Sequence, residues 1–115
     1  MTVTIFHNPK CSKSRQTLAL IEEQGISPTI VEYLKDVPTT EMLGKILDLL
    51  GLEPRQLMRR KEKEYAENDL ASEDKSRATL IQAMVDFPRL IERPIVLANG
   101  KAAIGRPPED VLKIL

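Results

Sequence analysis

Residues 2–6 alternate between polar and apolar side chains and are rich in β-branched residues, a pattern that predicts a short strand. From Ser12 onward the apolar positions recur at helical spacing, and Gly25 supplies a stop signal for that helix. Residues 28–33 form a second β-prone run. Because strand, helix and strand follow one another at short intervals, we expect a right-handed βαβ unit in which the two strands are parallel.

The middle of the chain has a helical pattern that a charged stretch interrupts. Thr39 or Thr40 is a suitable N-cap for a helix whose wide apolar face ends at Gly51. Residues 54–70 are charged and only weakly periodic, which favours short helical turns with a mostly solvated surface. Residues 76–86 again place their apolar side chains at helical spacing, so we predict a further helix there.

The clearest local signal lies in residues 94–105. Asn99-Gly100 separates two short β-prone runs, as in hairpins that are closed by a type I′ turn. Residues 107–115 predict a final helix, because proline stands near its first turn and acidic residues follow early, where the helix dipole favours them.

The predicted element order is therefore βαβ, a helical middle, a β-hairpin and a helix. This order is typical of the thioredoxin-like fold, an α/β architecture in which the βαβ and ββα halves share one mixed four-stranded sheet. We interpret residues 1–115 as a single domain of this fold, with a helical insertion over about residues 38–88.

Composition narrows the classes of function. The 115 residues are 42% hydrophobic and 30% charged, which is enough apolar material for a core without metals or disulfides. Lys plus Arg equals Asp plus Glu at 17 each, so no overall charge draws the chain to nucleic acid or to a membrane. One cysteine cannot form an internal disulfide, and the N-terminus lacks the pattern of a signal peptide. We therefore expect a cytoplasmic protein.

The candidate chemistry lies in residues 6–15, FHNPKCSKSR, which contain the only cysteine and the only histidine. Cys11 falls where a strand, a turn and a helix meet, and the unpaired N–H groups at a helix start stabilise a thiolate. His7 precedes the turn and can orient or polarise the loop. One cysteine and one histidine are too few soft ligands for zinc, so we expect no bound metal. The neighbouring side chains predict an anion-attracting loop and comprise Lys10, Ser12, Lys13, Ser14 and Arg15.

Three kinds of thiol chemistry do not fit the spacing around Cys11. A phosphatase-type loop needs arginine six positions after the cysteine, where this chain has Thr17. A dithiol oxidoreductase needs a second cysteine at the position of Ser14. A papain-like hydrolase is larger and keeps its Cys and His far apart in sequence. What remains is a single thiolate that an external thiol must regenerate.

Four motifs are spread over nearly the whole chain. They are H-N-P-x-C-x-x-S-R from His7, L-M-R ending at Arg59, E-R-P-I-V around Arg93 and G-R-P-P-E around Arg106. Together they resemble the glutaredoxin-coupled arsenate reductases of the ArsC family, and most closely its short bacterial members.

The resemblance implies a mechanism for the thiol loop. Cys11 would be the nucleophile that attacks the arsenic of arsenate, with His7 and Ser14 tuning or orienting the loop. Glutathione, as co-substrate, would attack the resulting adduct, and glutaredoxin would reduce the mixed species and release arsenite, as in arsenic detoxification. No bound cofactor is implied, and we expect the chain to act as a monomer.

The resemblance also implies that Arg59, Arg93 and Arg106 hold the oxyanion and the thiol adduct. Guanidinium groups suit this role because their fork geometry gives charge-assisted, often bidentate hydrogen bonds. Arg60 directly follows Arg59, so which of the two faces the site stays open. Arg93 precedes Pro94, a position at which thioredoxin-like folds commonly hold a cis proline facing the thiol.

Two other functions stay open. The thiol loop reads C-S-K-S where the best-known family members have C-G-T-S. The alternative is therefore a glutathione-dependent monothiol oxidoreductase of the same fold that acts on another oxyanion or on a thiol adduct. A Spx-like regulator that binds RNA polymerase is less favoured, because Ser14 replaces the second cysteine of its C-x-x-C switch.

Overall fold

The computed structural model describes residues 2–115, which fall into two compact units. We call Met1–Asp36 with Arg93–Leu115 the sheet unit, and Val37–Glu92 the helical unit. The interpretation of the chain as one domain with an insertion stays a prediction. Over the described residues, no helix has both the length and the apolar character needed to cross a membrane.

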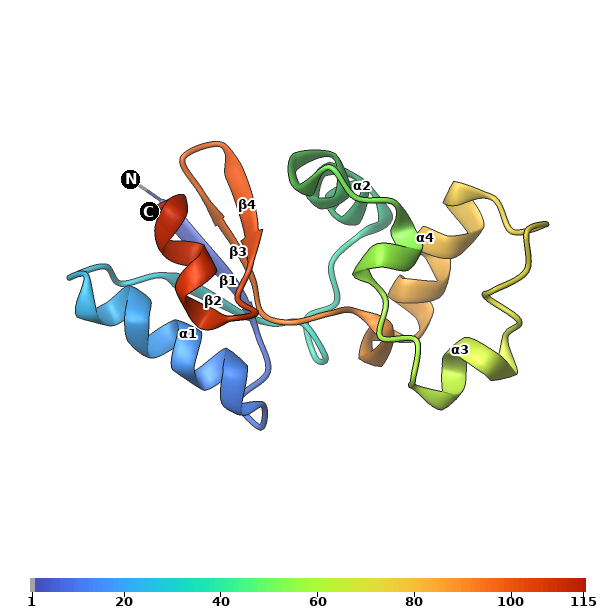
Figure 1. Cartoon of the computed structure of the whole chain (residues 1–115), viewed down its shortest axis with the longest axis horizontal. Coiled ribbons are helices and arrows are strands. Elements are labelled where there is room, and N and C mark those ends of the chain that lie inside the picture. The colour runs from blue at the N-terminus through green and yellow to red at the C-terminus, as the bar shows by residue number, and fades with distance from the viewer. Residues whose placement is uncertain (1) are drawn as a thin grey trace. The chain divides into compact units, whose positions relative to one another are not determined.

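The sheet unit contains one mixed four-stranded sheet in the order β2-β1-β3-β4 (Figure 1). Strand β1 pairs with β2 in parallel and with β3 in antiparallel orientation, and β3 pairs with β4 in antiparallel orientation. The mixed sheet and the parallel βαβ unit that the sequence predicts are thus confirmed. The elements of this unit are β1 (Val3–His7), α1 (Ser12–Glu23), β2 (Thr29–Glu32), β3 (Ile95–Ala98), β4 (Lys101–Ile104) and the 3-10 helix η3 (Pro108–Lys113).

The hairpin between β3 and β4 is closed as predicted. Asn99 and Gly100 have φ values of 55° and 72°, the two positive values that a type I′ turn requires. The Asn99 side chain donates a hydrogen bond of 2.7 Å from Nδ2 to the carbonyl of Ile114. The predicted final helix is present as a 3-10 helix, whose N–H groups bond three residues back, as from Asp110 to Pro107 at 3.0 Å.

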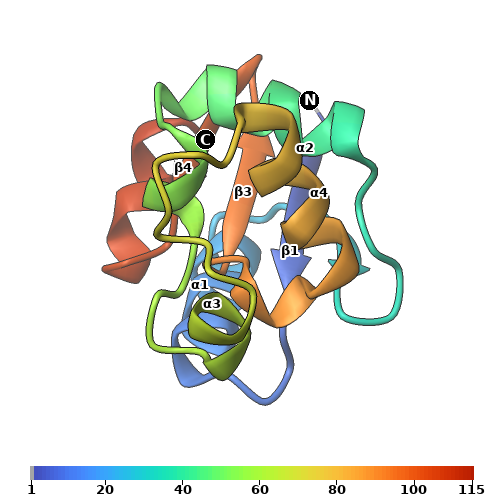
Figure 2. The ribbon, with the colours of Figure 1, turned by 90° about the vertical axis from the view of Figure 1, so that its right-hand side faces the viewer.

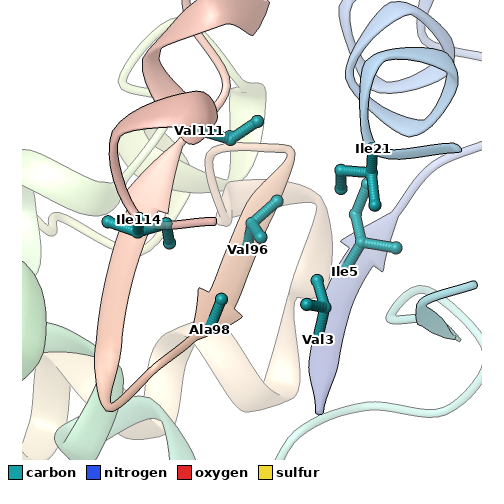
Figure 3. Packing of buried hydrophobic residues seen from close by; sticks show 7 residues of the cluster. All are labelled: Val3, Ile5, Ile21, Val96, Ala98, Val111 and Ile114. Carbon is teal, nitrogen blue, oxygen red and sulfur yellow. The ribbon is translucent and has the colours of Figure 1, made fainter. Parts of the chain in front are cut away.

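One face of the sheet carries the core of this unit (Figure 3). Removing such aliphatic side chains from water contributes about 1.5–3 kcal/mol each, which fixes α1 and η3 on the same face of the sheet. Because α1 is held there, its N-terminus lies beside the end of β1. The core residues are Val3 and Ile5 of β1, Ile21 of α1, Val96 and Ala98 of β3, Val111 of η3, and Ile114.

The helical unit contains the two helices that the sequence predicts. The Thr39 hydroxyl accepts the Met42 N–H at 3.1 Å and so caps α2, which ends at Gly51 in the left-handed conformation (φ 68°). Ser76 caps α4 in the same way, and α2 packs against α4 (Figure 2). The elements are α2 (Thr40–Leu50), η1 (Pro54–Leu57), α3 (Lys63–Glu67), α4 (Arg77–Asp86) and η2 (Pro88–Leu90).

The charged stretch over residues 54–70 contains two short helices, η1 and α3, as predicted. Its fold depends on Arg55, which the sequence pattern does not single out. The guanidinium of Arg55 donates to the carbonyl of Leu70 at 2.9 Å and to that of Ser72 at 2.6 Å. These bonds join two segments that have little apolar periodicity of their own.

Candidate active site

Cys11 is the N-cap residue of α1 and lies at the end of the turn that follows β1. Its N–H donates to the carbonyl of Asn8 at 3.0 Å, and its own carbonyl accepts the N–H of Arg15 at 3.0 Å. The thiol is free and partly exposed. The predicted placement of Cys11 at the start of a helix is therefore what the structure shows.

The surroundings of Cys11 favour the thiolate. Partial burial acts to raise the pKa of the thiol, but the N–H of Ser14, the Arg93 guanidinium and the N–H of Lys13 together hold that pKa below its ordinary value. The two N–H groups belong to the first turn of α1, where they have no partner within the helix. The geometry thus favours the thiolate form of Cys11 relative to that of a free cysteine.

His7 is buried and lies behind the loop. Its Nδ1 is 2.6 Å from Ser14 Oγ, and the same oxygen accepts the N–H of Asn8 at 3.0 Å. Ser14 is fully buried, so these bonds tie the end of β1 and the turn to the first turn of α1. The side chain of His7 contacts Ser14, and this contact fits a role in orienting the thiol loop.

The surroundings of His7 disfavour protonation of its imidazole. Burial lowers the pKa of His7 and Arg15 lowers it further, while Glu32 acts in the opposite direction. A histidine that is harder to protonate in the folded state binds fewer protons there than in the unfolded chain at mildly acidic pH. Its contribution to stability is therefore present above the unfolded pKa of about 6.5 and is lost as the pH falls below it.

We predict that the free energy of unfolding decreases between about pH 7 and pH 5.5, where histidine titrates in the unfolded chain. His7 is the only histidine, so a His7→Gln variant should lose most of this slope. Urea unfolding at a series of pH values measures it. Equal slopes for the two proteins would contradict the assignment of the slope to His7.

Two arginines converge on the thiol within the sheet unit. The Nη2 atom of Arg106 is 3.6 Å from the sulfur of Cys11, and Nε of the same side chain donates to the carbonyl of Arg93 at 2.8 Å. Arg93 in turn lowers the pKa of the Cys11 thiol by a hydrogen bond and by its charge. The structure thus brings together Cys11, Arg93 and Arg106, three residues that the sequence predicts as parts of one site.

The prolines that follow these arginines are both in the cis form. The Arg93-Pro94 bond is cis, as the fold predicts. The Arg106-Pro107 bond is also cis, and the sequence analysis did not predict it. A Pro-Pro pair after an arginine carries no signal that distinguishes the two isomers.

The basic side chains of the thiol loop are exposed, and one of them, Arg15, makes a hydrogen bond to the loop backbone. Arg15 donates from Nη1 to the carbonyl of Pro9 at 2.9 Å, across the turn. Lys10 and Lys13 are exposed beside the thiol loop, as is Ser12. Their predicted role in attracting an anion stays a prediction, and the described contact of Arg15 is with the loop backbone.

Arg59 and Arg60 belong to the helical unit and differ in their contacts. Arg59 Nη1 pairs with Glu62 at 2.7 Å, and its Nε lies 3.9 Å from a carboxylate oxygen of Glu92. Arg89 pairs with the second oxygen of Glu62 at 3.2 Å, so one carboxylate holds two guanidinium groups. Arg60 is exposed and donates only a long bond of 3.3 Å to the carbonyl of Arg55. Arg59 therefore has the better-fixed guanidinium of the two.

Within residues 2–115, no group of three or more His, Cys, Asp and Glu side chains is placed to hold a metal ion.

The family follows from comparison with known proteins. A family model described as the ArsC family matches residues 6–114, which is nearly the whole chain. This chain belongs to the ArsC family.

Individual ArsC relatives match over the full length. The uncharacterised protein YfgD of Escherichia coli strain K12 is 54% identical over 114 residues, covering 98% of this chain and 96% of the relative. An arsenate reductase of Haemophilus influenzae is 49% identical over 116 residues, covering 100% of both chains. The solved structure of an arsenate reductase from Vibrio cholerae is 53% identical and has a TM-score of 0.97, covering 100% of this chain and 98% of that one.

The ArsC assignment settles the fold class. With a TM-score of 0.97 to a structure at 53% identity, the thioredoxin-like α/β fold predicted from the order of the elements is confirmed. The roles of individual site residues are a separate matter, because they depend on the chemistry that the thiol loop performs.

Proposed function

We propose that this ArsC protein reduces arsenate to arsenite, with Cys11 as nucleophile and with glutathione and glutaredoxin as external reductants. The observation that carries this proposal is the position of Cys11, at the start of α1 and 3.6 Å from the Arg106 guanidinium. The lowered pKa of the thiol supports nucleophilic attack. Full-length similarity to proteins named arsenate reductase, at 47–49% identity, supports the choice of oxyanion.

The chemistry requires two electrons. In the first step the Cys11 thiolate displaces an oxygen of arsenate, which leaves as water after protonation, and a sulfur–arsenic bond forms. The glutathione thiolate then attacks the Cys11 sulfur and forms a disulfide with it. The sulfur–arsenic bond breaks, its electron pair stays on arsenic, and As(V) leaves as the As(III) of arsenite. Glutaredoxin takes over that oxidation by thiol–disulfide exchange and returns Cys11 to the thiolate.

Arg93 and Arg106 are proposed to bind the oxyanion, and the proposal is supported by the contact of both guanidinium groups with the Cys11 sulfur. Charge-assisted bonds from two guanidinium groups favour the oxyanion and the thiolate that attacks it. Arg59 is proposed to contribute a third guanidinium, and its ion pair with Glu62 fixes the orientation of that group. His7 and Ser14 are proposed to keep the loop in shape, with no direct part in bond making.

The need for an external thiol follows from the cysteine count. Cys11 is the only cysteine, so no second thiol of the chain can resolve its oxidised form. A hollow of about 230 Å³ adjoins the loop, and we propose that it receives part of glutathione, because its lining presents both signs of charge and glutathione carries carboxylates and an ammonium group. It is lined by His7, Asn8, Pro9, Lys10, Glu32, Leu34 and Lys35.

We predict that turnover of arsenate requires glutathione and glutaredoxin together, and that thioredoxin alone supports little activity. Arsenite formation is measured with each reductant omitted in turn. A Cys11–glutathione adduct should be trapped and detected by mass spectrometry. Full turnover with thioredoxin alone and no glutathione would overturn the mechanism.

A glutathione-dependent monothiol oxidoreductase is the second candidate. The observation that favours it is Lys13, an exposed cation in the first turn of α1 beside the thiol, where the best-known members have another residue. Turnover of small disulfides with glutathione, but not of arsenate, would favour this candidate. We further propose that the protein acts as a cytoplasmic monomer.

A further inference from the structure

Gly105 occupies the tightest backbone position among the glycines of the chain. A Cβ atom built at this residue would overlap Thr17 Oγ1, and it would lie 2.8 Å from Pro94 Cγ and 3.1 Å from Thr17 Cγ2. Real Cβ contacts are essentially never shorter than 3.0 Å. The other four glycines, among the described residues, have no heavy atom within 4 Å of such a Cβ.

The atoms that crowd Gly105 are not free to move aside. Thr17 is fully buried, and its hydroxyl donates to the carbonyl of Lys13 at 2.8 Å, which fixes the side chain. Pro94 is a rigid ring, and its carbonyl accepts the N–H of Gly105 at 2.9 Å. A side chain at position 105 would therefore push the surrounding segments apart, because no flexible chain end can yield.

These segments are the ones that carry the candidate site. Thr17 lies on α1, six residues after Cys11, whereas Pro94 directly follows Arg93 and Gly105 directly precedes Arg106. The bond of 2.8 Å from Arg106 Nε to the Arg93 carbonyl holds the two arginine segments together. Gly105 is thus the point at which the helix bearing the thiol meets both segments that bear guanidinium groups.

We infer that Gly105 is a positioning residue: its missing side chain lets α1 approach closely enough for Arg93 and Arg106 to reach the Cys11 sulfur. The contact of 3.6 Å between Arg106 and the sulfur depends on this close approach, since a hydrogen bond to sulfur weakens as the segments separate. The inference rests on the proposed function only in treating the thiolate as the reactive species.

The test compares Gly105→Ala with Gly44→Ala, a matched control in α2 where the added methyl group meets no atom within 4 Å. The pH dependence of Cys11 alkylation by iodoacetamide reports the thiolate. In Gly105→Ala we expect the midpoint to move up toward that of a free thiol, with alkylation at a pH below the midpoint slowed about tenfold for each unit of the shift. Inorganic phosphate should protect Cys11 from alkylation in the wild type and in Gly44→Ala, and more weakly in Gly105→Ala.

A merely structural role for Gly105 would lower stability without moving the alkylation midpoint. A Gly105→Ala protein that is folded by circular dichroism, with the alkylation profile and phosphate protection of the wild type, would therefore overturn the inference. Should Gly105→Ala fail to fold, Thr17→Ala/Gly105→Ala takes its place, because it removes the overlap with Thr17 and keeps the one with Pro94. A midpoint above that of Thr17→Ala supports the inference, and an equal midpoint overturns it.

These readouts do not depend on arsenate chemistry. If no variant and not even the wild type reduces arsenate, the proposed function fails, and the alkylation midpoints still decide the role of Gly105. If the wild type reduces arsenate and the alkylation midpoints coincide, the proposed function stands and the inference about Gly105 fails.

Discussion

Cys11→Ser is expected to lose arsenate reduction by a factor of about 10³ or more. A serine hydroxyl stays protonated near neutral pH and cannot form the sulfur–arsenic bond, and the chain contains no other cysteine that could replace it. Arsenite formation with glutathione and glutaredoxin present measures the loss. The glutathione adduct should disappear from the mass spectrum as well.

The fold should survive this change, because Cys11 is partly exposed and serine is a favoured N-cap residue. An unchanged thermal unfolding midpoint would confirm that the loss is chemical. A Cys11→Ser protein that retained a tenth or more of the wild-type rate would show that the reaction does not pass through this thiol.

Arg93→Ala and Arg106→Ala are each expected to lower kcat/KM for arsenate by about tenfold to hundredfold. A charge-assisted hydrogen bond contributes about 1.5–3 kcal/mol, which corresponds to losses of that size. Arg93→Lys and Arg106→Lys should recover only part of the loss, because an ammonium group keeps the charge and not the fork geometry. Steady-state kinetics over a range of arsenate concentrations gives the comparison.

Arg77→Ala is the control for these variants. Arg77 is an exposed residue of α4 that pairs with Asp48 at 3.1 Å, and surface ion pairs of this kind contribute little. Its removal should leave kcat/KM unchanged. Equal effects of Arg77→Ala, Arg93→Ala and Arg106→Ala would mean that the two arginines beside the thiol have no specific role.

Much of the fold could be predicted because its signals are local. The Asn99-Gly100 turn depends on the two residues that accept positive φ, and the N-cap at Thr39 depends on a hydroxyl three residues before the N–H that it accepts. The thiol loop was equally accessible, because a lone cysteine at a strand-to-helix turn with basic neighbours points to a thiolate.

What escaped prediction depends on contacts between segments far apart in the chain. Arg55 braces residues 70–72, and Glu62 pairs with both Arg59 and Arg89, but nothing in the local pattern distinguishes these charges from solvated ones. Gly105 is a further case. Its need for a hydrogen in place of a side chain arises from α1, which lies almost ninety positions away in sequence.

The two bonds to Ser14 have a consequence for how this loop can evolve. Replacing Ser14 with cysteine would give the C-x-x-C spacing of a dithiol protein. Sulfur is larger than oxygen and a weak hydrogen-bond acceptor, so that change would leave the buried imidazole of His7 and the N–H of Asn8 poorly satisfied. The step from one-cysteine to two-cysteine chemistry is therefore a single residue change that also weakens the two hydrogen bonds joining β1 and the turn to α1.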